Sequence, residues 1–207
     1  MKYVIIGAGG TGGILGFYMT KAGKDVTLIA RNAHLAAMKE QELTVRHLWD
    51  GTTETVPVKA ENMETYESMI ASAGEAAKPD VILVCVKGYS LDNTVPFVQK
   101  IAKKSTIVIP ILNIYGTGSR LQKKLPELLV TDGCIYVSAN IEGPGALVQH
   151  GKILRVVFGV REKSEFREEL KEIAKDFSDS GISGELSENI RRDALEKFSY
   201  VSPIGAA

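Results

Sequence analysis

A glycine-rich turn that directly follows a short apolar run is the feature that most constrains the fold of this chain. The apolar residues 3–6 have the composition of a buried strand, and they lead into Gly7-Ala8-Gly9-Gly10-Thr11-Gly12-Gly13. In this spacing Gly7 allows a tight turn, Gly9 lets the backbone approach a pyrophosphate, and Gly12 lets a helix pack closely on the strand. The free N–H groups at the start of that helix also suit phosphate. The pattern predicts a dinucleotide-binding turn at Gly7, Ala8, Gly9, Gly10, Thr11 and Gly12.

The residues on either side of the turn fit a strand–helix–strand unit. Apolar residues at positions 14, 15, 17, 18 and 19 supply one face of a helix, and Gly23 marks its end. Residues 25–30 have the pattern of a second strand, so residues 2–30 have about the length of a βαβ unit. A flexible glycine loop without a ligand is the alternative, but the strand before and the helix after favour the dinucleotide site.

The end of the second strand indicates which dinucleotide is bound. A site for NAD normally has an aspartate or glutamate there, which accepts a hydrogen bond from the ribose 2′-hydroxyl. This chain has Ala30-Arg31-Asn32 instead, without a carboxylate. The planar, charged guanidinium of Arg31 suits a 2′-phosphate, so we expect NADP(H). A solvated surface arginine is the alternative.

Composition and charge exclude several classes of protein. With 207 residues, 44% of them hydrophobic, the chain is long enough for a full core. Its formal net charge of +0 argues against nucleic acid or an anionic membrane as the main partner. The chain enters its first strand at once, without a signal-type leader, and no apolar run reaches the ~18 residues of a membrane span.

The cysteines and histidines favour a cytoplasmic protein without a structural metal. Cys85 and Cys134 both lie in apolar, strand-like stretches, where buried free thiols fit better than a disulfide. His34, His47 and His150 are scattered along the chain without the spacing of metal ligands.

A short hairpin is predicted in the middle of the first half of the chain. Residues 43–47 and 55–58 would form its strands around Asp50-Gly51. Pro57 marks the second of these strands as an edge, because proline cannot donate a ladder hydrogen bond.

The remaining pattern alternates buried strands with helices. The continuous apolar runs 81–86 and 106–112 are typical of strands buried on both faces of a parallel sheet. Helical patterns at 62–77 and 94–102 precede these two runs. We therefore predict an α/β fold with a Rossmann-type doubly wound parallel sheet.

Polar residues follow the two buried runs where each predicted strand ends. Lys87 comes directly after residues 81–86, and Asn113 comes directly after residues 106–112. Ligands bind at the carboxyl edge of open α/β sheets. A lysine there supplies positive charge, and an asparagine both donates and accepts, so we expect both in the site. Strands that simply end in polar surface residues are the alternative.

These residues resemble the pattern of ketopantoate reductases (2-dehydropantoate 2-reductases). Members of that family have an N-terminal G-x-G-x-x-G, an arginine after the second strand, a lysine ending the fourth strand and an N-G-x-G-like loop after the fifth. The corresponding positions here are Gly7 to Gly12, Arg31, Lys87 and Asn113-Ile114-Tyr115-Gly116, with Ile114 in place of the usual glycine. Segment 133–139 is also similar to the family, and by analogy Ala139 lies beside the cofactor.

The family's catalytic lysine lies early in a helical second domain, and the corresponding segment here is Ala194-Leu195-Glu196-Lys197-Phe198. The position of Lys197 on the predicted helix independently supports a functional role for this lysine. At 100° per residue, Ile190, Ala194 and Val201 fall within roughly 60° of Lys197, so this lysine lies on the apolar stripe. A lysine in that position either extends its ammonium to solvent or is functional.

The resemblance implies two domains. Residues 1–184 would form an NADP-binding Rossmann domain, and residues 185–207 the first helix of a truncated, all-helical substrate domain of ~100 residues. Val201 stands where the family often has asparagine, so the exact substrate is left open. The apolar face of the last helix would dock elsewhere or pair with a second chain, giving a possible homodimer.

The resemblance also implies a reaction, the reduction of 2-dehydropantoate to pantoate by NADPH in pantothenate biosynthesis. Lys197 would hydrogen-bond the ketone oxygen and deliver a proton, and Asn113 would hold substrate or the nicotinamide ribose. Lys87 would contact the cofactor or attract the substrate carboxylate. A related NADP-dependent reductase of another 2-oxo acid, a non-catalytic NADP(H)-sensing domain and a Rossmann domain without nucleotide remain alternatives.

Overall fold

A six-stranded parallel sheet forms the centre of the computed structural model, which describes the backbone of residues 1–205 and the side chains of residues 1–199. Every neighbouring pair in this sheet is parallel. Its strands, in spatial order, are β5 (Lys59–Glu61), β2 (Asp25–Ile29), β1 (Lys2–Ile6), β6 (Val81–Val84), β7 (Ile107–Pro110) and β8 (Leu129–Val130). The predicted Rossmann-type doubly wound sheet is confirmed.

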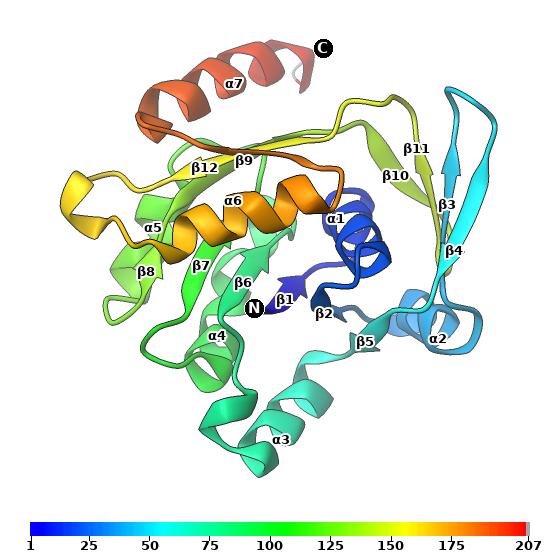
Figure 1. Ribbon diagram of the computed structural model, residues 1–207, viewed down its shortest axis with the longest axis horizontal. Coiled ribbons are helices and arrows are strands. Elements are labelled where there is room, and N and C mark those ends of the chain that lie inside the picture. Colours follow the sequence, from blue (N-terminus) through cyan, green and yellow to red (C-terminus); the bar gives the residue numbers. More distant parts are fainter. Residues whose placement is uncertain (206–207) are drawn as a thin grey trace.

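Helices cover both faces of this sheet (Figure 1). Tyr3 and Ile5 belong to the core under α1 (Gly10–Lys21) and α6 (Glu169–Asp179), whereas Val4 and Ile6 pack on the opposite side. That opposite side is covered by α3 (Met63–Ala73), α4 (Val95–Ile101) and α5 (Thr117–Lys124). Because successive strand residues point to opposite faces, β1 is apolar throughout its buried length.

Shorter helical segments connect these elements. Helix α2 (Asn32–Gln41) follows β2 and contacts β5. The single-turn helices are η1 (Glu75–Ala77), η2 (Gly88–Ser90), η3 (Asp92–Thr94) and η4 (Lys163–Glu165).

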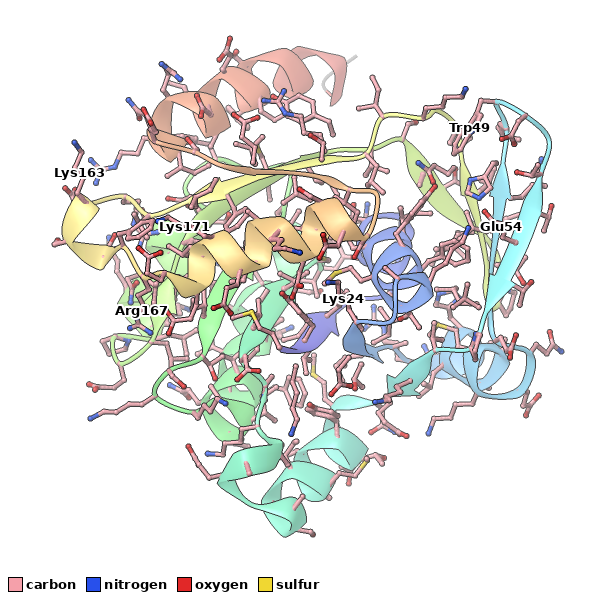
Figure 2. All side chains as sticks on the ribbon, in the orientation of Figure 1. Lys24, Trp49, Glu54, Lys163, Arg167 and Lys171 are labelled. Atoms are coloured by element: carbon pink, nitrogen blue, oxygen red, sulfur yellow. The ribbon has the colours of Figure 1, made fainter. Side chains whose placement is uncertain are left out.

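Two smaller sheets pack beside the central one. The first has four strands in the order β10 (Ala139–Gly143), β11 (Ala146–Gln149), β3 (Leu43–His47) and β4 (Thr53–Val56). The second has three strands in the order β13 (Ser183–Leu186), β12 (Arg155–Gly159) and β9 (Asp132–Tyr136). The predicted hairpin is therefore present as β3 and β4, with β4 at an edge, and Trp49 and Glu54 lie on it (Figure 2).

Helix α1 is buried because it lies between the central sheet and the four-stranded sheet. A Cβ on Gly16 would overlap the side chain of Leu28 in β2, and one on Gly13 would overlap Leu147 in β11. Glycine at these two positions therefore lets strands approach the helix from both sides. The first turn of α1 is consequently fixed in place by two sheets.

Helix α6 is attached to the sheet by a small polar cluster as well as by its apolar face. The Tyr3 hydroxyl donates to Asp176 Oδ2 at 2.6 Å, and the Lys24 ammonium donates to Asp176 Oδ1 at 2.7 Å. Lys24 lies just after α1 and reaches α6 (Figure 2). The cluster joins α1, β1 and α6 into one layer.

Several predicted elements end earlier in the structure than the sequence pattern indicates. The helix predicted for 62–77 stops at Ala73, because Gly74 takes a φ of 80°. The apolar runs 81–86 and 106–112 are strands only to Val84 and Pro110, although single backbone hydrogen bonds to the sheet continue at Cys85 and Ile111. Strand β4 ends at Val56, so Pro57 follows the strand instead of lying within it.

The last described helix, α7 (Ile190–Gly205), lies across β9 and β12 (Figure 1). The predicted domain boundary after residue 184 falls inside β13, and the division into two domains stays a prediction. The side chain of Val201 lies outside the described residues. Within the described part of the chain, no helix combines the length and apolarity needed to cross a bilayer.

Candidate active site

The ends of β1, β6 and β7 bring the predicted site residues to one edge of the central sheet. The strand order runs outward from β1 to β2 on one side and to β6 on the other, so the order reverses between β1 and β6. Backbone hydrogen bonds continue past the strands, from Cys85 N to Ile6 O and from Ile111 N to Val84 O, both at 2.8 Å. This reversal is where open α/β sheets form ligand crevices.

The glycine turn after β1 is tightly enclosed on one side and open on the other. Gly7 has a φ of 100°, which favours glycine, and its N–H donates to Ile29 O at 3.0 Å. A Cβ on Gly12 would overlap the carbonyl oxygen of Gly7, whereas a Cβ on Gly9 would meet nothing within 4 Å. Gly12 thus serves packing, and Gly9 leaves space for a ligand against the backbone.

The start of α1 presents unpaired backbone donors at this open side. The helix begins after Gly9, which has no side chain to cap it, and its first turn contains no acidic residue. The first N–H groups of a helix have no partner within the helix, and its N-terminal end carries a partial positive charge. The residues present therefore fit a pyrophosphate group.

His34 braces the glycine turn, and the sequence analysis did not identify it as a site residue. Its Nδ1 accepts a hydrogen bond from the Gly145 N–H at 3.0 Å, so Nε2 carries the proton and donates to Ala8 O at 2.8 Å. The imidazole thereby joins the turn to the loop between β10 and β11. No sequence signal could have shown this, because His34 and Gly145 are 111 residues apart.

Replacing His34 with alanine is expected to lower the free energy of unfolding by about 1–3 kcal/mol, because two backbone groups lose their partner. The measurement is urea unfolding followed by circular dichroism. His150→Ala is the matched control, because the His150 side chain is exposed and its imidazole bonds a side chain, that of Asn140, instead of backbone groups. Equal midpoints for the two variants would contradict the bracing role.

The structure leaves the side chains of Arg31 and Lys87 exposed at the same edge. Arg31 directly precedes α2, and among residues 1–199 no carboxylate lies within 4.0 Å of its guanidinium. Lys87 immediately precedes η2 after β6. Both cations are therefore available to an anionic ligand, and their roles stay predictions.

Ala139 lies against the glycine turn. A Cβ on Gly10 would overlap the Ala139 carbonyl oxygen, so the start of β10 touches the first turn of α1. The backbone of Ala139 thus forms one wall beside the predicted pyrophosphate position. Its contact with a cofactor stays a prediction.

Asn113 and Lys197 line one small cavity, although they are far apart in the sequence. The cavity has a volume of about 10 Å³, which is room for about one water molecule. Its walls come from the segment after β7, from β9 and from α7: Leu112, Asn113, Ile114, Gly133, Cys134, Ala194, Lys197 and Phe198. The predicted substrate residues are thus brought together, while Arg31 and Lys87 lie outside this cavity.

Lys197 also borders a larger hollow, of about 820 Å³, between α7 and the outer face of the three-stranded sheet. Burial lowers the pKa of its ammonium group from the usual 10.5, and the neighbouring Cys134 opposes this. Burial in turn raises the pKa of the Cys134 thiol to about 11, so the thiol is uncharged at neutral pH. The Lys197 Nζ lies 4.2 Å from the centre of the Tyr136 ring.

The sequence analysis missed Cys134 and Tyr136 as neighbours of Lys197. Both lie on β9 two residues apart, so they share the face of the sheet that α7 covers. The alternation of that strand could have shown that they share a face. It could not have shown that α7 packs on it.

Comparison with known proteins identifies the family. A family model described as ketopantoate reductase PanE/ApbA matches residues 3–163. A 2-dehydropantoate 2-reductase of Pyrococcus horikoshii is 29% identical over 217 residues, which cover all of this chain and 64% of that protein. The chain therefore spans less than two thirds of the length of this curated relative.

Solved structures resemble the chain over nearly its whole length. A 2-dehydropantoate 2-reductase from Porphyromonas gingivalis W83 superposes with a TM-score of 0.83 and 25% identity, covering 98% of this chain and 69% of that one. A D-mandelate dehydrogenase, solved with NADH and anilino(oxo)acetate, gives a TM-score of 0.79 and 25% identity, covering 95% of this chain and 60% of that one. The similarity thus extends to a dehydrogenase that is named for a different acid.

Proposed function

The chain belongs to the ketopantoate reductase family, a family of oxidoreductases, and we propose that it serves the NADPH-dependent reduction of 2-dehydropantoate to pantoate in pantothenate biosynthesis. The observation that carries this proposal is the shared cavity of Asn113 and Lys197, beside the sheet edge where the glycine turn lies. A phosphate-binding turn and a half-buried lysine at one edge are what a carbonyl reductase needs.

The proposed chemistry assigns one task to each side chain. When bound, NADPH supplies the hydride that reduces the ketone carbon. The Lys197 ammonium hydrogen-bonds the ketone oxygen, stabilises the negative charge that develops there and gives up a proton to it. The Asn113 amide orients the substrate or the nicotinamide ribose, and Lys87 attracts an anionic group.

The cofactor proposal depends on Arg31. Because no carboxylate follows β2 and the Arg31 guanidinium is exposed, the residues present fit a 2′-phosphate better than a free 2′-hydroxyl. We also propose that the protein is located in the cytoplasm, where NADPH would be available to it.

Arg31→Ala is expected to weaken NADPH binding by about tenfold or more and to leave NADH binding nearly unchanged, because a charge-assisted hydrogen bond to the 2′-phosphate is lost. Calorimetric titration with each nucleotide measures this. Lys39→Ala, in the following helix, is the control, because Lys39 instead pairs with Glu61. Equal losses for NADPH and NADH would contradict the assignment.

A second candidate substrate is favoured by the apolar residues next to Asn113. Ile114 and Tyr115 are 47% and 43% exposed at the sheet edge, where the family loop usually has a glycine in place of Ile114. These side chains suit a 2-oxo acid with a larger apolar substituent. The similarity to a D-mandelate dehydrogenase is consistent with this alternative.

The length comparison adds a structural proposal. Because the chain spans 64% of the Pyrococcus protein, we propose that a helical continuation completes the substrate site in the full protein. The cavity between Asn113 and Lys197 holds only about one water, so a 2-oxo acid does not fit between these two side chains as they lie here.

The deciding experiment compares nucleotide binding with turnover in the full protein. Calorimetry gives the affinities for NADPH and NADH, and steady-state kinetics give kcat/KM for 2-dehydropantoate and for a panel of other 2-oxo acids. The highest value for 2-dehydropantoate would support the proposal, and a higher value for another acid would transfer it to the alternative. Tight NADPH binding without turnover would instead indicate a sensing domain.

A further inference from the structure

The ring of Tyr136 contacts two cations. The Lys197 Nζ is 4.2 Å from the ring centre, and the Arg155 Cζ is 5.2 Å from it. Tyr136 is the last residue of β9, and Arg155 is its direct cross-strand partner at the start of β12. The contact therefore follows from strand register on one side and from the packing of α7 on the other.

The aromatic ring is the main partner of the Lys197 ammonium. Among residues 1–199, no carboxylate lies within 4.0 Å of its Nζ. The nearby carboxylates have other partners, since Glu185 accepts from Arg155 and Asp193 accepts from Ser187 and Arg192. The remaining groups that face this region are Glu196, which is exposed, and the Cys134 thiol, which is uncharged at neutral pH.

Arg155 also lies against the ring, from the neighbouring strand β12. Its guanidinium donates to Glu185 on β13, with Nε at 3.1 Å from Oε2, so Glu185, Arg155 and Tyr136 form a row across the three strands. The contacts of this row hold the ring in place independently of Lys197. A cation on a ring face is attracted by the ring quadrupole without transferring its charge.

We propose that Tyr136 is a positioning residue that holds the Lys197 ammonium over its ring face and leaves the N–H donors of that ammonium free for a substrate oxygen. The inference rests on the proposed function of Lys197. A carboxylate partner would hold the lysine equally well, but it would raise the pKa and occupy the donors. The ring raises the pKa only slightly and forms no conventional hydrogen bond with the ammonium, so the lowering of the pKa by burial prevails.

The test observes Lys197 directly, so it does not depend on activity. Lysine labelled with ¹³C at Cε is incorporated into the chain, and the Lys197 signal is assigned by its loss in Lys197→Arg. In the wild type its Hε resonances are expected upfield of those of exposed lysines, because they lie over the ring. Tyr136→Leu should move them to the exposed position, and Tyr136→Phe should keep them in place.

The same spectra, recorded against pH, give the pKa of Lys197. Loss of the ring in Tyr136→Leu should lower this pKa by about half a unit, because a cation–π contact at a partly exposed site contributes about 0.5–1 kcal/mol. Tyr136→Phe should restore the wild-type value. Lys171, which lies over the Phe166 ring at 5.5 Å, is the internal control and should not respond.

Two results would overturn the inference: a wild-type Lys197 signal at the exposed position, or one that Tyr136→Leu leaves unchanged. Failure of the proposed function looks different. In that case the Lys197 signals behave as expected, but Lys197→Ala leaves the turnover of every 2-oxo acid intact.

Discussion

Replacing Lys197 with alanine is expected to lower kcat for the preferred 2-oxo acid by a factor of about 10² to 10⁴, the usual contribution of a positioned proton donor. The physical reason is that the alkoxide oxygen loses both a charge and a proton source in a half-buried site. NADPH affinity should stay within about twofold, because Lys197 lies in the cavity with Asn113 and away from the glycine turn. Steady-state kinetics and calorimetry measure the two quantities.

Leu195→Ala is the matched control for this substitution. Leu195 is on the same helix and is 51% exposed, so its truncation should leave kcat unchanged.

The pH dependence of kcat in the wild type gives a second check on Lys197 as the proton donor. Since burial lowers the Lys197 pKa, the protonated donor is lost as pH rises through a value below 10.5, and kcat should fall there. An alkaline limb that survives in Lys197→Ala would show that another group donates the proton.

The second large effect is expected for Gly12→Ala, which should lower the free energy of unfolding by about 3 kcal/mol or more. The added Cβ would overlap the Gly7 carbonyl oxygen and would also press on the Cys85 side chain under the turn. Backbone atoms cannot move aside as a flexible side chain can, so α1 would have to separate from β1. Thermal and urea unfolding measure the loss.

Gly9→Ala is the informative partner of that variant. A Cβ on Gly9 would meet nothing within 4 Å, and its φ of −77° is open to alanine, so stability should hardly change. NADPH affinity should nevertheless fall about tenfold or more, because the methyl group occupies the space for the pyrophosphate. If Gly9→Ala unfolded the protein, or if Gly12→Ala were fully stable, the division between a binding glycine and a packing glycine would be wrong.

The central sheet and its glycine turn were predictable from the sequence, because both depend on local pattern. The G-x-G-x-x-G spacing specifies a strand, a turn and a helix within one short segment, and two apolar runs with polar ends indicate buried parallel strands. Lys87 and Asn113 could therefore be assigned to the correct edge before any coordinates were known. The ends of the strands were less predictable, because the apolar runs continue past Val84 and Pro110, where the strands end. The helix end at Gly74 has a local cause, the positive φ of a glycine.

The remainder of the site depends on contacts between distant segments, which periodicity does not encode. His34 braces Ala8 only because β10 and β11 pack beside α1, and Tyr136 meets Lys197 only because α7 covers β9. Neither residue forms part of a recognisable motif. The burial of Lys197 could be anticipated from its helical stripe, but its partner could not.

The parallel pairing of β11 with β3 has a consequence for the order in which this protein folds. β3 and β4 are neighbours in the chain, so they can pair as soon as both are synthesised. β3 can pair with β11, which places Thr44 beside Ala146, only after about 100 more residues have been added. Two contacts of the glycine turn region form equally late in synthesis. They are the hydrogen bond from Gly145 to His34 and the packing of Ala139 against Gly10. Pairing between segments so far apart in the sequence slows folding. We therefore expect that a nascent chain with the glycine turn but without residues 139–145 lacks the contacts that hold this turn in place.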